Sequence, residues 1–480
     1  MKKILFLTLC CFVTSCSSIV DSHKQKKELL RDFEKAKSKS TTKKITDKLK
    51  STKNSGDQLM WNLEAGTNYF INYDYKNSLV QFSTAEKIIN DFDSRAVINA
   101  RGISSEIAVS VTNLNALPYD GFGYDRIMVN CYKALTYFAL NNTEAGLVEL
   151  RRLRNTQKII EKRHQSQILA DRKKIEKENL QLKKTVSEDS INSSDNMKNI
   201  AIDLKKNCEK KYGNLMNPFA TYLSAIGYLY ENNSSEALVD FKNLYRIEKN
   251  NDYVNSHYVE LLNKFGEKIP KDLEKYNLQK PDDKKVYIIF ANGRSAAYEQ
   301  QKFWLILPYV GYTGLAYPKI IFYNNNIKGA VIKTDSQQYK LQKIASMDAV
   351  IAEEYSDRLA PMITRIAVSY VVKELASYTA VEATRNKDNS NDLGVIATYI
   401  GTGIYKYIFN TADTRSWELL PKEYLIANIP CPKSKKLELQ PLPTGDKLNI
   451  KIDNINAKII IVYLRSNSNQ IISSNVFYLK

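Results

Sequence analysis

The sequence predicts an α-helical, tetratricopeptide-like N-terminal half followed by a mixed α+β C-terminal domain. Two observations lead to this fold class. Between residues 57 and 276 prolines are few and apolar residues recur at spacings of three and four, the period of an amphipathic helix. From Lys284 onward β-rich runs such as VYIIF and KIIFY follow one another. The polar segment between the two regions carries Pro270 and Pro281, so we predict domains at 57–276 and 284–480.

The first residues have the features of a secretory signal. Two lysines precede an apolar run from Ile4 to Val13, well below the roughly 20 residues that a membrane-spanning helix needs. The sequence VTSC, which ends at Cys16, resembles the lipobox of bacterial lipoproteins, whose cysteine is acylated and becomes the mature N-terminus. We therefore expect a signal peptide over 1–15 and fatty acids such as palmitate on Cys16. Ordinary signal-peptidase cleavage after Ser15 is the alternative.

The residue after the lipobox bears on location. In enteric bacteria an Asp at that place retains a lipoprotein in the inner membrane, and this chain has Ser17. The resemblance therefore implies the periplasmic face of the outer membrane, with the inner membrane as the alternative for a host that sorts differently. Several acyl chains hold a protein stably on a bilayer.

The chain is strongly basic, with a formal net charge of +18. Residues 17–56 hold twelve Lys or Arg against five Asp or Glu, which predicts a flexible or weakly helical lipidated tether over 16–56. Anionic lipid or peptidoglycan suits the positive charge. Nucleic acid is not expected as a partner, because the signal directs the protein to a compartment without it. A lysine-rich composition produced by an AT-rich genome explains the charge equally well.

Within the helical half one pattern of small and aromatic residues recurs. In tetratricopeptide repeats a small residue lets two antiparallel helices cross closely, and an aromatic side chain from each helix packs on its neighbour. Two stretches match this spacing, and a third matches with a turn one residue shorter. The positions are Gly66, Tyr69, Ser78, Phe82 and Ala85 in one copy, Ala225, Tyr228, Ala237, Phe241 and Leu244 in another, and Ala134, Tyr137 and Ala145 in the short copy. An unrelated antiparallel helical bundle is the alternative.

Repeats of this kind line a groove with their inner helices. In the copy that begins at Asp57, the polar residues Asn62, Asn68 and Asn72 lie outside the packing positions, so we expect them to face an extended peptide. We also expect the segment from Asp57 to Tyr276 to fold as a unit by itself. These expectations make the helical half the predicted binding region for another envelope protein.

A charged segment from about 156 to 212 interrupts the repeats. Its sparse apolar positions cannot form a globular core and predict a long helix, a turn rich in Ser, Asp and Asn, and a return helix. An arm that reaches a partner and a solvated insertion are equally good interpretations.

The C-terminal half mixes strands with long apolar helices. We expect a strand at VYIIF, a hairpin that turns at 324–326 and returns through IKGAVIK, and further strands after residue 423. Asp348–Ala383 predicts a largely buried helix that Pro361 kinks or restarts. Leu393–Phe409 predicts a central buried helix, with a membrane span as the alternative.

The segment ADTRSW is the most distinctive in this half. Asp413, Arg415 and Trp417 could form a partner-binding site. We favour a structural role, a buried Asp–Arg pair beneath a tryptophan that fastens the apolar helix to the following strand.

Several segments together resemble a family of uncharacterised bacterial lipoproteins with an N-terminal tetratricopeptide-like helical region. They are YDRIMVNCYKALTYFALNNTEAGLVELRR, NPFATYLSAIGYLYENNSSEALVDF, FANGRSAAYEQQKFWLILPYVGYTGLAYPK and ADTRSWELLPKEY. The likeness runs from the lipobox almost to the end and is less distinctive after Leu442. It implies an envelope protein without an established activity, sometimes encoded beside lipoproteins linked to peptidoglycan synthase activation.

No catalytic or cofactor motif stands out. The chain has three histidines, and the sequence contains no HExxH, CxxC or Walker motif, so neither a metal nor a cofactor is expected. Gly293-Arg294-Ser295 after VYIIF is similar to a nucleophile elbow, but the second glycine is absent and every histidine precedes the serine. The sequence therefore favours a non-enzymatic envelope scaffold or adaptor. The alternative is a peptidoglycan- or ligand-binding, wall-active lipoprotein that uses its C-terminal domain.

Overall fold

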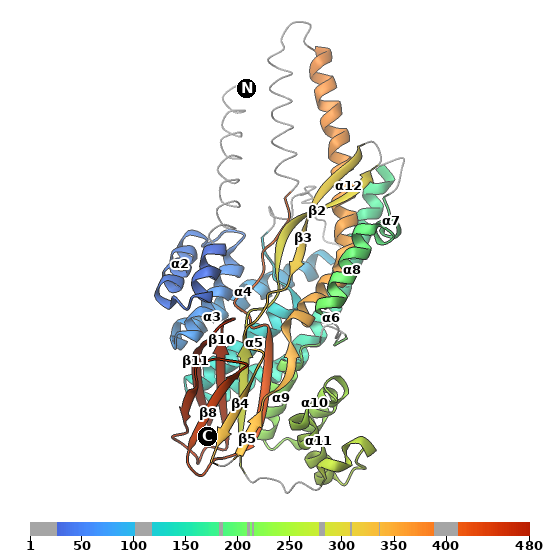
Figure 1. The fold of residues 1–480 in the computed structure, drawn as a ribbon. Coiled ribbons are helices and arrows are strands. Elements are labelled where there is room, and N and C mark those ends of the chain that lie inside the picture. Colours follow the sequence, from blue (N-terminus) through green and yellow to red (C-terminus); the bar gives the residue numbers. More distant parts are fainter. Residues whose placement is uncertain are drawn as a thin grey trace.

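The computed structural model describes residues 26–100, 118–181, 186–208, 212–213, 216–277, 284–307, 310–335, 337–387 and 411–480. The predicted signal peptide, Cys16 and the apolar stretch 393–409 lie outside these residues. Figure 1 shows a body of helices and sheets from which a narrower arm extends upward.

The N-terminal part of the described chain is helical. A helix over residues 26–34 comes first. The others are α2 (Ser38–Ser51), α3 (Gln58–Ile71), α4 (Tyr75–Ala100), α5 (Gly123–Ala139), α6 (Thr143–Gln181), α7 (Glu188–Asn192), α8 (Asp195–Asn207), α9 (Pro218–Tyr230), α10 (Ser234–Ile247), α11 (Asp252–Phe265) and the 3-10 helix η2 (Lys271–Tyr276).

The C-terminal part is rich in strands, as its sequence predicts, and contains the long helix α12 (Met347–Lys387) with Pro361 inside it. The strands are β1 (Lys285–Asn292), β2 (Ala297–Leu307), β3 (Gly311–Ile321), β4 (Gly329–Thr334), β5 (Gln337–Lys340), β6 (Gln342–Ser346), β7 (Glu423–Pro430), β8 (Lys436–Leu442), β9 (Leu448–Lys451), β10 (Ile459–Ser466) and β11 (Ile471–Leu479).

Among the described residues, three helical hairpins share one turn: α3–α4, α5–α6 and α9–α10. In each turn one residue has a left-handed backbone, and the next residue donates its backbone N–H to the carbonyl of a tyrosine near the end of the first helix, at 2.9 Å. This pattern satisfies carbonyls that a helix end would otherwise leave unpaired. The left-handed residues are Tyr73, Asn141 and Asn232, and the bonds run from Asp74 to Tyr69, from Asn142 to Tyr137 and from Asn233 to Tyr228.

The common turn corrects one sequence prediction. The α5–α6 turn is as long as the other two, so the small residue at the helix crossing is Gly146 and the choice of Ala145 was wrong by one position. Gly146 is buried against the Phe138 ring, whereas Ala145 is half-buried. At the equivalent crossing in α3–α4, a Cβ on Gly66 would lie 2.6 Å from the ring of Phe82. Glycine therefore allows close approach in both hairpins.

The prediction of a flexible or weakly helical tether is wrong from residue 26 onward. Leu29, Phe33 and Ile45 are buried in the same core as the hairpins. Lys44 pairs with Asp32 at 2.6 Å, and Asn68 of α3 donates to the Thr42 hydroxyl at 2.9 Å. A few well-spaced apolar residues are enough to fold this basic segment onto α3, because each of them is buried among other apolar side chains.

In the described part of the chain the strands form three sheets. One has five strands in the order β11-β10-β1-β7-β6, in which β1 and β10 are parallel and the other pairs antiparallel. A four-stranded antiparallel sheet has the order β5-β4-β8-β9, and β2 and β3 form a separate two-stranded ribbon. The predicted return from β3 through a turn at 324–326 is therefore wrong, since β4 pairs with β5 and β8.

The five-stranded sheet lies between the helices and the four-stranded sheet. Along β1, Val286, Ile288 and Phe290 pack toward the four-stranded sheet. The alternating residues Tyr287 and Ile289 belong to the core that contains the helices. This alternation follows from the two-residue period of a strand, and it makes β1 buried on both faces.

The helical and strand-rich regions consequently share one hydrophobic core. Phe219 of α9 stacks on Tyr424 of β7, with ring centroids 3.5 Å apart. Trp417 packs against Phe82 and Tyr132, which stack on each other and belong to the first two hairpins. The domain boundary near residue 280 is a boundary in the sequence pattern, and the packing continues across it.

The arm combines the charged segment with later elements. Figure 1 shows α6, α7 and α8 beside α12 and the β2–β3 ribbon. Arg365 of α12 pairs with Asp171 of α6 at 2.8 Å, and Lys319 of β3 lies 3.6 Å from Asp203 of α8. The predicted long helix and return helix thus contact α12 and β3. No helix within the described ranges is long and apolar enough to cross a membrane.

Candidate functional site

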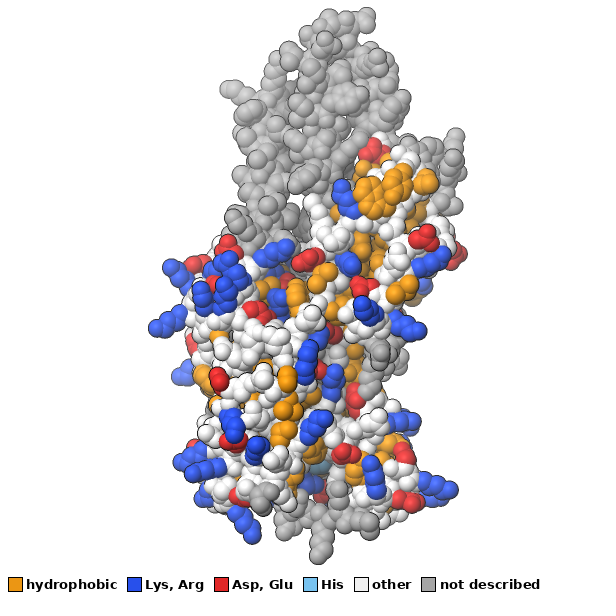
Figure 2. Space-filling view, viewed as in Figure 1, with side chains coloured by type: hydrophobic (Ala, Val, Ile, Leu, Met, Phe, Trp, Pro, Cys, Tyr) orange, Lys and Arg blue, Asp and Glu red, His pale blue; other side chains and the backbone are white. Residues whose placement is uncertain are grey.

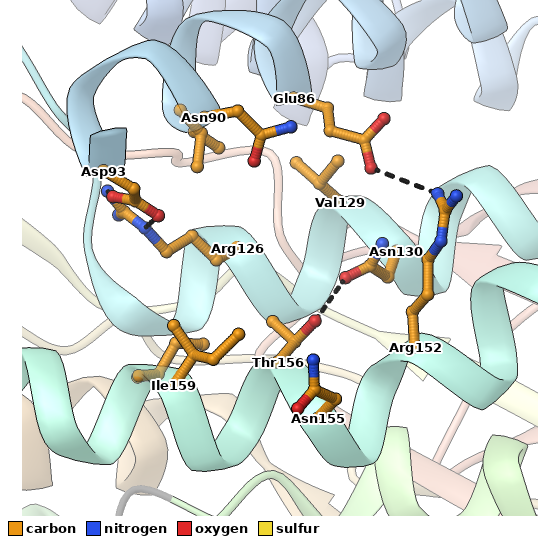
Figure 3. Close-up of a pocket in the computed structure, with 12 residues that line it drawn as sticks. Glu86, Asn90, Asp93, Arg126, Val129, Asn130, Arg152, Asn155, Thr156 and Ile159 are labelled. Atoms are coloured by element: carbon orange, nitrogen blue, oxygen red, sulfur yellow. Dashed lines mark hydrogen bonds and ion pairs between the residues drawn. The ribbon is translucent and has the colours of Figure 1, made fainter. Parts of the chain in front are cut away.

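A groove on the helical hairpins is the candidate site. It has a volume of about 420 Å³ and lies between α4, α5 and α6 (Figure 3). Val129 of α5 and Ile160 of α6 are buried beneath it, while Ile159 is 49% exposed at its wall. The remaining lining is Glu86, Ile89, Asn90, Asp93, Arg126, Asn130, Arg152, Asn155 and Thr156.

One end of the groove is closed by a charged network. Lys133, which is almost fully buried, pairs with Glu86 at 2.6 Å and with Glu149 at 2.7 Å. Arg152 reaches Glu86 at 3.7 Å across the groove, as the dashed line in Figure 3 marks. Because the Glu86 carboxylate is shared between Lys133 and Arg152, the middle of α4 is tied to α5 and α6.

The other end carries a second network. Arg126 of α5 pairs with Asp93 of α4 at 3.0 Å and donates to the Gly121 carbonyl at 2.9 Å. Arg163 of α6 also pairs with Asp93, and with Asp120 at 2.7 Å. Burial raises the pKa of the Asp93 carboxyl, and the charge of Arg126 opposes that rise. The groove is therefore held between two fixed ionic ends.

The middle of the groove is polar but uncharged. Thr156 donates its hydroxyl to the Asn130 side-chain oxygen at 3.2 Å, and Asn130 donates to Glu149 at 2.8 Å. Figure 3 shows Asn90 above and Asn155 below, on opposite helices. Amides with donors and acceptors above an apolar floor can pair with the main chain of an extended peptide.

The asparagines that the sequence assigned to a groove have other roles. Asn68 donates to Thr42 of α2, and Asn62 and Asn72 donate to the carbonyls of Gln58 and Asn68 within α3, at 2.7 and 2.8 Å. The expectation that they face a peptide was wrong, because α2 packs on that face of α3. Sequence analysis also missed Arg152, Asn155, Thr156 and Ile159, although their spacing of three and four places them on one face of α6.

A second, larger pocket lies in the strand-rich region. It has a volume of about 740 Å³ between α11, η2, β5 and β7. Tyr253 donates to the Lys340 carbonyl at 2.9 Å, and Lys285 pairs with Glu260 at 2.6 Å within it. Its other lining side chains include Asn263, Asn277, Gln337, Gln338 and Tyr339. Tyrosines and amides of this kind suit a hydrophilic ligand.

The ADTRSW segment packs onto the N-terminal helices. Arg415 pairs with Asp413 at 2.7 Å and with Asp57 at 3.1 Å. Trp417 is fully buried and hydrogen-bonds to Thr67 of α3. The described contacts therefore hold the residues just before β7 against α3. The apolar helix at 393–409, which we expected this segment to hold in place, lies outside the described residues.

Next to Trp417, the buried carboxyl group of Glu64 accepts hydrogen bonds from the backbone of the following residues. Glu64 of α3 accepts the backbone N–H groups of Glu418 and Leu419 at 2.8 and 3.1 Å. Burial raises the pKa of Glu64 to about 7, and Lys26 opposes that rise. Lys26 itself pairs with Glu418 at 2.7 Å.

The remaining reactive side chains are dispersed. Ser295 is buried. His257 contacts Tyr287 at 3.2 Å and stacks on Phe241, and His164 lies near Asp357 at 3.4 Å. In the described ranges Cys131, Cys208 and Cys431 are free thiols, and no group of three side chains there could hold a metal.

The repeat positions have the burial expected of packing residues. Across the hairpins the three tyrosines are half-buried, and the small and aromatic positions around them are buried. The buried positions are Gly66, Ser78, Phe82, Ala85, Ala134, Ala225, Ala237, Phe241 and Leu244.

Comparisons with known protein families, curated proteins and solved structures found no match to this chain.

Proposed function

We propose that the protein is a lipid-anchored envelope adaptor that binds an extended segment of another envelope protein in the groove between α4, α5 and α6. The observation that carries the proposal is the combination of an apolar floor, amide side chains on opposite walls and fixed ionic ends. Binding then uses several weak contacts without turnover of the bound segment.

The turn shared by the three helical hairpins supports this proposal, in which we interpret the hairpins as tetratricopeptide-like repeats. The same turn, and the tyrosine whose carbonyl it uses, recur in α3–α4, α5–α6 and α9–α10, and a small buried residue lies three positions before that tyrosine in each hairpin. Hairpins of that type leave a groove between neighbours whose side chains are not required for stacking. The lipobox at Cys16 and the resemblance to lipoproteins support an anchor in the outer membrane, facing the periplasm.

In-cell crosslinking tests the groove. A photo-reactive amino acid at Ile159, which is 49% exposed in the groove wall, is expected to capture one discrete envelope protein. The matched control is Val80, which is 56% exposed on α4 outside the groove. With the photo-reactive residue moved to Asn155, which is exposed and also lines the groove, Ile159→Asp is expected to abolish the capture at unchanged melting temperature. Equal adducts from both positions would contradict the proposal.

The alternative function uses the second pocket for a glycan such as peptidoglycan. Its larger volume and its tyrosine and amide lining favour this candidate. Co-sedimentation with purified peptidoglycan separates the two functions. Loss of sedimentation in Asn263→Ala, with full sedimentation of Ile159→Asp, would support the alternative.

A further inference from the structure

The β2–β3 ribbon has one buried and one exposed face. Phe303, Leu307 and Leu315 are buried, and the last two pack with Val368 of α12. The opposite face carries Trp304, Ile306 and Tyr312, whose exposed fractions are 42%, 79% and 71%. The pattern follows the two-residue alternation of a strand, so the ribbon presents a rigid apolar face to its surroundings.

The exposed face is ordered by its own contacts. Trp304 stacks on Tyr312 with ring centroids 5.3 Å apart, and Ile306 pairs with Tyr312 across the ribbon. A Cβ on Gly314 would lie 3.1 Å from the Trp304 ring, so the indole covers this glycine. Lys302 lies 5.6 Å from the Trp304 centroid. Figure 2 shows the hydrophobic patch at this end of the arm with a basic side chain beside it.

We propose that this face, defined by Lys302, Trp304, Ile306 and Tyr312, inserts into the interface of the bilayer that holds the lipid on Cys16. The inference rests on the proposed lipid anchor. Trp and Tyr are the residues enriched at membrane interfaces, because the ring is apolar and its polar group stays hydrated. Ile306 enters the acyl boundary, and Lys302 faces anionic headgroups.

The length of the chain before the ribbon fits this placement. Lys27 lies 3.9 Å from Glu299 at the base of β2, so the described chain begins beside the ribbon. From Glu299 to Leu307 the strand rises roughly 26 Å at about 3.3 Å per residue. The chain from Cys16 to Lys27 spans at most roughly 40 Å when fully extended. The acylated end and the ribbon tip therefore reach the same bilayer surface.

Tryptophan fluorescence tests the proposal. All three tryptophans of the sequence are described, and Trp61 and Trp417 are buried, so the emission lost in Trp304→Phe reports on the ribbon. The full chain is reconstituted in vesicles of phosphatidylethanolamine and phosphatidylglycerol with brominated lipids. A second preparation carries Cys16→Ser and is added to the same vesicles from outside.

We expect blue-shifted, bromine-quenched Trp304 emission in the acylated preparation. For the Cys16→Ser chain, the double variant Ile306→Ser, Tyr312→Ser should lower vesicle binding roughly tenfold, because apolar area leaves the bilayer. Val239→Ser, at a site 46% exposed on α10, should leave vesicle binding unchanged.

Water-exposed, unquenched Trp304 emission on acylated chains overturns the ribbon proposal while the anchor stands. Quenching in a chain that has the native Cys16 but takes up no fatty acid supports the ribbon and refutes the anchor. Shielding of Trp304 by envelope proteins in place of lipid overturns the ribbon proposal.

Discussion

Trp417 donates its indole N–H to the Thr67 hydroxyl at 2.9 Å, across 350 positions of sequence. Thr67 in turn donates to the Leu63 carbonyl at 3.1 Å. The indole ring lies 5.7 Å from Phe82 and 5.5 Å from Tyr132, measured between centroids. One side chain of the strand-rich region thus completes the core of the first two helical hairpins.

Trp417→Ala should lower the free energy of unfolding by about 3–5 kcal/mol, because it leaves a cavity among aromatic rings and removes a buried donor. Chemical denaturation measures the change. Trp304→Ala is the matched control at an exposed tryptophan and should cost below about 1 kcal/mol. Equal effects of the two substitutions would contradict the packing described above.

Arg415→Ala should destabilise the fold by about 3 kcal/mol, since two carboxylates, Asp57 and Asp413, then lose a shared cation. Arg415→Lys should fall between the alanine variant and the parent, because a lysine keeps the charge and loses the two-pronged contact. Thermal melting measures both variants. Unchanged melting together with lost function in cells would make the segment a partner-binding site.

Cutting the chain between residues 277 and 284 should leave the two pieces associated. The contacts of Phe219 with Tyr424, and of Trp417 with α3, bury apolar surface that either piece alone would expose. A protease site inserted there, followed by size-exclusion chromatography, checks this. Separation into two folded monomers would instead support the independent helical unit that the sequence predicts.

Stability should fall as pH rises from about 4.5 to about 7 through the titration of Glu64. The folded protein retains a proton on this carboxyl that the unfolded chain releases, so rising pH favours unfolding across this window and has no further effect above it. Asp125 acts in the same direction, because burial raises its pKa to about 7 against the hydrogen bond from Tyr119.

Glu64→Gln should remove its part of that pH dependence. Denaturation midpoints at about pH 5 and about pH 8 give the comparison. The substitution retains the volume of the side chain but leaves one backbone N–H of Glu418 or Leu419 without its acceptor. A parent protein whose stability rises across the window, or a variant with an unchanged slope, would contradict the assignment.

Cys16→Ala should abolish fatty-acid incorporation and shift the protein from the membrane fraction, or leave it as an unprocessed precursor. Metabolic labelling with palmitate measures incorporation. Cys131→Ala is the control, because that thiol is buried among the hairpins and should take up no lipid. Label on the Cys16→Ala variant would refute the lipoprotein hypothesis.

The sequence by itself determined the classes of element and the helical hairpins. The spacing of Gly66, Tyr69 and Phe82 predicted a close helix crossing, and VYIIF predicted the central strand β1. These features depend on local backbone geometry, because a helix repeats every 3.6 residues and a strand every two. The candidate groove was not predicted, because the sequence around Asn155 and Thr156 has the pattern of any solvent-exposed helix face. Only the tertiary structure places α4 opposite these residues.

Only the tertiary structure decided which elements meet. The parallel pairing of β1 with β10, and the packing of residues 26–56 on α3, join segments far apart in sequence. A basic segment with a few apolar residues is flexible or folded according to whether a complementary pocket exists, and only distant residues supply that pocket. Local periodicity therefore indicated the helical hairpins and the central strand, while long-range burial of apolar surface decided which elements pack together and joined two sequence regions into one core.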